Sequence, residues 1–445
     1  MSPTKLSSIT ARRHRARPAG HWTQLQRLHP VRLVMLAALP VAVLAGSPQR
    51  VILSALIAAA YVFAAVVTLR RELVDRVLIA YVAVVAIWML ASWLRARYAL
   101  HLQPEQLAYA TSKTAYFVLI VLPMAAAVAV MVDRPEAIWP AAVAQVAVGA
   151  VVALITVVSL GDHFLGADRY SWQGNLIALG TVLAIQPWPI HRIRASAILG
   201  VVGVVGIMLA GSRQALAAAA VGLVLSALYW GASRYLGGAG TAWSRLRSAV
   251  SGGYVILPLA LLVLTAGYLA VTYAGYAGVH LWGGASTSSS CHCVTDRLVS
   301  LETNAGDRDK LLAHGMQLFL SNPILGGGLG SFAGAVPDSL HPGHFYQYPH
   351  NVPLEIASET GIVGALLILF PLLLGWAALF WRGVKLASAP IASTLMLLAI
   401  FFTVANVSGD IPSERGLWIF GIVAFKLGVD YIWSRHRSRN MARAA

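Results

Sequence analysis

Long apolar runs alternate with short polar connections along most of the chain. The runs are about 17 to 25 residues long, and a helix of about 20 apolar residues crosses the hydrocarbon core of a bilayer. The pattern therefore predicts an all-α polytopic membrane protein with about twelve transmembrane helices. The predicted spans centre on residues 31–45, 51–69, 73–94, 111–132, 138–159, 174–190, 193–211, 213–230, 252–272, 361–381, 391–407 and 416–433.

Composition and charge narrow the class of protein further. Of the 445 residues, 58% are hydrophobic and 11% are charged, which excludes a soluble multidomain enzyme. The net charge of +16 is compatible with nucleic-acid binding, but the arginines lie at the ends of apolar runs rather than on one soluble face. We therefore interpret them as topology signals and expect no nucleic-acid partner.

Lysine and arginine concentrate in the N-terminal tail, in alternate connections and after the last span. Cytoplasmic segments carry the excess of these residues, so both termini are predicted to be cytoplasmic. The first apolar run resembles a signal peptide, but its basic leader is too long, and we treat it as a span. The predicted organisation is a basic cytoplasmic tail at 1–30, transmembrane helices one to nine at 31–272, a large periplasmic loop at 273–360, transmembrane helices ten to twelve at 361–433 and a basic cytoplasmic tail at 434–445.

Several basic residues fall on the predicted outer side, against the topological bias. Arg213 is the most informative, because Gly211 to Gln214 form a minimal turn between two apolar runs. A charge at the membrane boundary is costly and indicates a functional site. The alternative is a snorkelling arginine that touches lipid phosphate. The other basic residues on this side are Arg50, Arg95, Arg97, Arg169, Arg297, Arg308, Lys310 and Arg415.

Arg308 begins a segment through Leu320 whose apolar spacing predicts an amphipathic helix over the membrane surface. We expect the arginine in the first turn of that helix, where backbone donors favour anions. The alternative is a solvated pair with Asp307 or Asp309. These two aspartates have the spacing of a divalent-metal site, but Arg308 and Lys310 would oppose a cation, so no metal is expected.

A histidine-rich segment precedes the tenth span. Asn351 is suited to cap a helix, Pro353 suits its first turn, and His350 therefore lies at the mouth of a membrane helix. The positive end of that helix disfavours the imidazolium form, and a neutral ring can act as a general base. The alternative is a histidine packed among headgroups with its polar edge in water. The same segment contains His341, His344, Tyr346 and Tyr348.

Two further patterns carry weaker signals. Cys291 and Cys293 flank His292 without the spacing of a zinc site, and they are compatible with a strained disulfide or with free thiols. The glycine-rich stretch at 323–330 lacks the lysine and hydroxyl residue of a nucleotide loop. We expect it to be a flexible turn that lets the backbone approach a ligand.

The spacing of three motifs resembles that of O-antigen ligases and their relatives. The first is His350-Asn351, nine residues, then Gly361-Ile362-Val363-Gly364. The second is Arg308 followed by Ser321-Asn322-Pro323 through Gly330-Ser331-Phe332, and the third is Gly211-Ser212-Arg213. Asp168-Arg169-Tyr170 through Gly174-Asn175 is a weaker match to another outer loop of that family. The span count and the single large outer loop are similar as well.

The resemblance implies a metal-independent glycosyltransferase of the GT-C kind, without cofactor or ATP. Direct displacement of the diphosphate would invert the anomeric centre, and we expect an inverting enzyme on that ground. Its donor is O-antigen on undecaprenyl diphosphate, and its acceptor is an outer-core sugar of lipid A-core. His350 would activate the acceptor hydroxyl, Arg213 and Arg308 would hold the diphosphate, and 273–360 would be the catalytic loop. The further substrate contacts that we expect are Arg169, His344, Tyr348 and Asn351.

Three alternatives remain open at this point. An O-antigen polymerase or a protein O-oligosaccharyltransferase would use the same donor and differ in its acceptor. A lipid or polysaccharide transporter would carry out no chemistry, but transporters place their sites near the bilayer midplane rather than at one side. The expected location is the bacterial inner membrane, with the active site facing the periplasm and membrane lipids around the spans.

Overall fold

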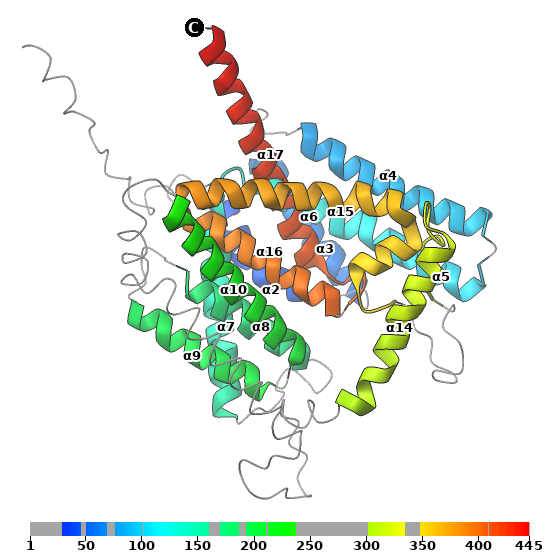
Figure 1. Ribbon diagram of the computed structural model, residues 1–445, viewed down its shortest axis with the longest axis horizontal. Coiled ribbons are helices and arrows are strands. Elements are labelled where there is room, and N and C mark those ends of the chain that lie inside the picture. The colour runs from blue at the N-terminus through cyan, green and yellow to red at the C-terminus, as the bar shows by residue number, and fades with distance from the viewer. Residues whose placement is uncertain are drawn as a thin grey trace, which may run out of the picture.

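The computed structural model describes residues 29–45, 50–68, 76–100, 102–159, 170–186, 193–210, 212–236, 301–333, 348–407 and 409–444. The regular structure of these residues is helical (Figure 1). The helices are α2 (Pro30–Ala45), α3 (Val51–Thr68), α4 (Arg76–Tyr98), α5 (Pro104–Tyr116), the π-helix η3 (Phe117–Val121), α6 (Leu122–Met131), the 3₁₀ helix η4 (Pro135–Ile138), α7 (Trp139–Val158), α8 (Tyr170–Ala184), α9 (Ile193–Leu209), α10 (Arg213–Leu236), α14 (Leu301–Ser321), α15 (Val352–Leu386), α16 (Ala389–Val407) and α17 (Arg415–Ala444).

The predicted all-α membrane fold is confirmed. Within the described residues, eight helices are long and apolar enough to cross a membrane, and shorter apolar helices lie at 30–43 and 195–209. Each predicted span except 252–272 coincides with a helix, and 252–272 lies outside the described residues. The segment predicted as a C-terminal tail continues α17 as a projecting helix (Figure 1).

The exposed surface of the bundle is apolar. Ile52 and Phe63 on α3, Ile87 on α4 and Val151 on α7 are between 57% and 79% exposed. In water such a surface would be unfavourable, whereas in a bilayer these side chains contact lipid tails. The helices satisfy their own backbone hydrogen bonds, as a membrane span requires.

Contacts between connections define two ends of the bundle. Arg32 at the start of α2 pairs with Asp133 beyond the end of α6, at 2.9 Å. The other end of α2 meets the start of α17, where Arg415 Nη1 donates to the carbonyl of Ala42 at 3.4 Å. We call this second end the Asn351 end, because the start of α15 lies there too. Its connections are those predicted to be outside.

Helix α15 bends sharply near its beginning (Figure 1). Gly361 has φ 69° and ψ −176°, a conformation that is essentially restricted to glycine. The bend separates a short segment at 352–360, here called the half-helix, from a long apolar segment at 362–386. The boundary predicted between the outer loop and the tenth span, at 360 and 361, coincides with this bend.

The glycine-rich turn packs against the bend in α15. The amides of Gly327 and Gly328 donate to the carbonyls of Ser358 and Glu359, at 2.8 and 2.9 Å. Helix-end carbonyls that would otherwise lack partners are thereby satisfied. We expected the backbone of this turn to approach a ligand closely. In the structure it approaches the half-helix instead.

Two of the arginines that oppose the topological bias have local partners. Arg95 Nη1 donates to the carbonyls of Leu325 and Gly326 in the glycine-rich turn, at 2.7 and 2.8 Å. Arg415 is 2% exposed and donates to Ala42. These arginines bind protein backbone, which explains their position without reference to topology.

Alanine at the bend should lower the stability of the protein. A Cβ atom at Gly361 would lie 2.2 Å from the carbonyl oxygen of Ile324, and one at Gly326 would lie 2.4 Å from the carbonyl carbon of Glu359. We expect Gly361→Ala and Gly326→Ala each to lose about 1–3 kcal/mol from backbone strain alone. Thermal unfolding in detergent measures the loss.

The control is Gly231→Ala within α10, where nothing lies within 4 Å of the added Cβ atom. Alanine favours a helix over glycine, so this variant should be as stable as the parent or more stable. Equal melting temperatures for Gly361→Ala and Gly231→Ala would contradict the account of the bend.

Candidate functional site

The predicted helix cap before α15 is present. Asn351 has φ −149° and ψ 103°, and its Oδ1 accepts a hydrogen bond from the Leu354 amide at 2.9 Å. Pro353 lies in the first turn, as expected. Asn351 Nδ2 also donates to the carbonyl of Asn406 at 3.1 Å, so the cap joins α15 to the end of α16.

His350 lies directly before this cap and is half-buried. Its φ of 57° is in the left-handed region, which few non-glycine residues adopt. Its ring packs edge-on against Tyr348, with 4.7 Å between the ring centroids. A strained conformation persists only where its surroundings determine it, and at functional sites such strain is often part of the mechanism.

Arg213, predicted to lie within the minimal turn, is the first residue of α10. Helix α9 ends at Leu209, and Ser212 Oγ accepts from the Ala215 amide at 3.3 Å as a cap. The helix backbone is described at Arg213, whereas the direction of its guanidinium lies outside the described atoms.

The packing of α10 places Arg213 at the Asn351 end. Tyr229 near the end of α10 donates to the carbonyl of Ser388, directly before α16, at 2.7 Å. Midway along both helices, a Cβ atom at Gly222 would lie 3.3 Å from Ile400. The helices are therefore antiparallel, and the start of α10 lies toward the end of α16 that bonds to the α15 cap.

Arg308 lies on α14, but not where the sequence predicted it. The helix begins at Leu301, so Arg308 lies two turns inside rather than in the first turn, and the argument from helix-end donors is wrong. Further along α14, a Cβ atom at Gly315 would lie 3.0 Å from Leu354 and 3.5 Å from Pro349. Arg308 is seven residues from that contact, roughly 10 Å along the helix.

Arg213 and His350 thus lie at helix ends on the Asn351 end of the bundle. Arg308 lies on a helix that contacts this end. In Figure 1 the first residues of α10 and of α14 both lie toward the lower side of the bundle. The convergence of the two guanidinium groups on His350 stays a prediction. Tyr348 and Asn351 accompany His350, whereas Arg169, His344, Cys291 and Cys293 lie outside the described residues.

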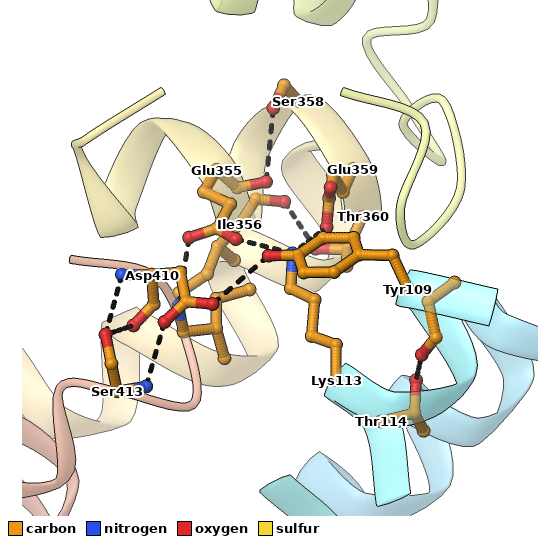
Figure 2. A network of polar contacts seen from close by, with 12 residues as sticks. Tyr109, Lys113, Thr114, Glu355, Ile356, Ser358, Glu359, Thr360, Asp410 and Ser413 are labelled. Carbon is orange, nitrogen blue, oxygen red and sulfur yellow. Dashed lines mark hydrogen bonds and ion pairs between the residues drawn. The ribbon is translucent and has the colours of Figure 1, made fainter. Parts of the chain in front are cut away.

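Sequence reasoning missed a buried ion network on the half-helix that follows His350 and its cap (Figure 2). Lys113 Nζ on α5 lies 2.5 Å from Glu355 Oε1 and 2.5 Å from Glu359 Oε2, both on the half-helix. All three side chains are fully buried. Charges at such depth are stable only when they are paired and hydrogen-bonded.

The network continues into the connection before α17 (Figure 2). Glu355 Oε2 accepts from the Ile411 amide at 2.9 Å. Asp410 accepts from the hydroxyl of Tyr109 at 3.1 Å and from the amide of Ser413 at 3.0 Å. The network therefore ties α5, the half-helix and residues 410–413 together, with one ammonium among three carboxyl groups.

A signal for this network was present in the sequence. Lys113 interrupts the apolar run predicted at 111–132, and Glu355 and Glu359 follow His350 with a spacing of four residues. Ionisable residues inside membrane spans are rare, face the bundle interior and pair with one another. The charge of Lys113 inside a predicted span could therefore have been paired in advance with carboxyl groups close to the start of another span.

Metal ligation finds no support in the described part of the chain, where no group of three or more His, Cys, Asp or Glu side chains is arranged to hold an ion. The side chains of Asp307 and Asp309 lie outside it. The candidate site therefore consists of His350 and its cap, the two arginine positions and the ion network on the half-helix.

These features define an integral membrane protein of polytopic, all-helical fold, with polar chemistry gathered at one end of the bundle. The model of the family described as O-antigen ligase matches residues 198–369, so this part of the chain is similar to that family. The match contains Arg213, Arg308, His350 and Gly361. No curated protein matches the chain. The match supports a role in polysaccharide transfer during lipopolysaccharide biosynthesis.

The cap before α15 can be tested separately from catalysis. Asn351→Ala removes both the bond to the Leu354 amide and the bond to Asn406, and we expect a loss of about 1 kcal/mol from the cap alone. Asn351→Ser keeps a capping oxygen and loses the bond to Asn406, so it should lose less stability than Asn351→Ala. Melting temperatures in detergent compare the two, and equal losses would show that the cap contributes little.

Proposed function

We propose that this protein transfers O-antigen polysaccharide from undecaprenyl diphosphate to an outer-core sugar of lipid A-core. The reaction takes place at the periplasmic face of the bacterial inner membrane, with both termini in the cytoplasm. His350 is the general base, and Arg213 and Arg308 bind the diphosphate. Tyr348, Asn351, Arg169 and His344 are further candidates for substrate contact. The proposal includes no metal, cofactor or ATP.

One observation carries the proposal: His350 is held in a left-handed conformation at the mouth of α15, within the region that matches the O-antigen ligase family. The mouth of the helix lies at the same end of the bundle as the start of α10. The positive end of the helix favours the neutral imidazole, which can accept a proton.

The chemistry follows from these roles. His350 takes the proton of the acceptor hydroxyl, whose oxygen forms a bond to the anomeric carbon of the donor sugar. The bond from that carbon to the diphosphate oxygen breaks, and the leaving diphosphate keeps the electron pair. Two guanidinium groups bind the developing charge in fork geometry. Attack opposite the leaving group inverts the anomeric centre.

Reconstitution with a choice of acceptors tests this function. The purified protein receives an undecaprenyl-diphosphate glycan with lipid A-core, with a second donor molecule or with an acceptor protein, each in excess chelator. We expect polymer only on lipid A-core, with an inverted anomeric configuration. A longer lipid-linked chain would identify a polymerase, and glycosylated protein would identify an oligosaccharyltransferase. Loss of activity on chelation would contradict the metal-free mechanism.

His350→Ala should lower the turnover by about 10²- to 10⁴-fold, because a general base is removed. Binding of the donor should be retained. The matched control is His436→Ala on the exposed end of α17. Transfer at the parental rate in His350→Ala would exclude the histidine as the base.

Arg213→Lys and Arg308→Lys should restore little of the activity that is lost in the alanine variants. Lysine keeps the charge but cannot bind a phosphate through two parallel hydrogen bonds. The control is Arg382→Lys, since Arg382 on α15 lies far from His350 along that helix and packs over the Tyr431 ring. Measurements of kcat/KM for the donor compare these variants. Full activity in both lysine variants would rule out fork geometry.

A further inference from the structure

We propose that Lys113, through its ion pairs with Glu355 and Glu359, is a positioning residue for His350. The inference rests on the role proposed above for His350 as the general base. It assigns a function to an ammonium group that is buried in the protein and does not itself touch a substrate.

The half-helix needs lateral contacts to define its direction. The bend at Gly361 disconnects it from the long segment of α15, because a residue with φ 69° and ψ −176° does not continue helical geometry. His350 precedes the half-helix directly. Its ring therefore follows the rotation and tilt of the half-helix rather than those of the transmembrane segment.

Lys113 supplies two attachment points on one face of the half-helix. Glu355 and Glu359 are four residues apart, so their side chains project from the same face. The ammonium group bonds to both at 2.5 Å, and it lies 5.4 Å from the centroid of the Tyr109 ring. Two contacts separated by a helical turn restrict both the rotation of the half-helix and its tilt against α5.

Other contacts hold the ends of the half-helix. At the beginning, the Asn351 cap bonds to α16, and Glu355 accepts from the Ile411 amide. At its end, the glycine-rich turn bonds to the carbonyls of Ser358 and Glu359. In each of these contacts a neutral amide donates to a carbonyl or carboxylate oxygen. Among the groups named here that hold the half-helix, Lys113 contributes the positive charge.

Charge makes Lys113 hard to replace. The amides of Gly330 and Phe332 lie near the Glu359 carboxyl group, yet Glu359 Oε1 has no hydrogen bond of normal geometry. Without the ammonium group, two carboxyl groups would face each other in a medium of low dielectric constant. Repulsion or the entry of water would then move the half-helix, and His350 with it.

Burial argues against a catalytic role for the carboxyl groups themselves. Glu355 and Glu359 are fully covered by protein and directed to Lys113. His350, by contrast, is half-buried at the mouth of the helix. The network therefore acts on the reaction through the histidine.

Steady-state kinetics of Lys113→Met give the first test. A misplacement of about 1 Å by a distant substitution can cost about 10²-fold in rate, and we expect a loss of kcat of that order, with KM for the donor unchanged. The matched control is Lys426→Met on α17, which removes a buried lysine from its 3.0 Å pair with Asp430 and should keep the parental kcat. Parental kcat in Lys113→Met would overturn the proposal.

The second test reads His350 directly. Diethyl pyrocarbonate modifies neutral imidazole, and peptide mass spectrometry follows the modification of each histidine against pH. In Lys113→Met, the rate and the pH midpoint for His350 should shift, while those for His436, on the exposed end of α17, stay constant. An unchanged His350 profile, or equal shifts at both histidines, would show a merely structural role and overturn the proposal.

Glu355→Gln and Glu359→Gln keep the test decisive if Lys113→Met does not fold. Glu355 holds both Lys113 and the Ile411 amide, so its loss should lower kcat and shift the His350 profile more than Glu359→Gln does. A larger effect of Glu359→Gln than of Glu355→Gln would contradict the proposal that contacts in the first turn of the half-helix position His350. Should His350→Ala keep its activity, the proposed function fails, whereas the modification profiles still report whether the network positions the ring.

Discussion

The attraction between one buried ammonium group and two carboxyl groups organises the Asn351 end of the bundle. In a membrane protein the hydrophobic effect contributes little to the choice between neighbouring apolar helices, because lipid tails are as apolar as leucine. Polar contacts therefore specify the arrangement. Lys113 joins the fourth predicted span to the half-helix before the tenth, and the Ile411 amide adds the connection before the last span. His350 directly precedes the cap of the half-helix that this arrangement holds in place.

Much of the fold could be predicted from the sequence, for a physical reason. A bilayer requires a continuous apolar stretch in each span, so the runs mark the helices and their limits. Local chemistry was accessible as well, since the cap at Asn351 depends on the capping residue and on Pro353 close to it. Both signals depend on neighbouring residues alone.

The unpredicted features depend on residues that are far apart in the chain. Lys113 was read as part of an apolar run because its partners lie more than 240 residues away. Residues 301–306 carry no amphipathic period, so the early start of α14 and the depth of Arg308 in it were missed. The glycines at 326–330 signalled close backbone approach, but they did not name the helix that is approached.

The half-helix also gives a geometrical meaning to a spacing in the family signature. Nine residues separate Asn351 from Gly361, and these nine residues are the half-helix itself. Each residue of an α-helix advances the chain by about 100° around the axis. One residue more or fewer between the histidine and the bend would therefore turn the imidazole by more than a quarter of a revolution, so the interval sets the phase of the ring.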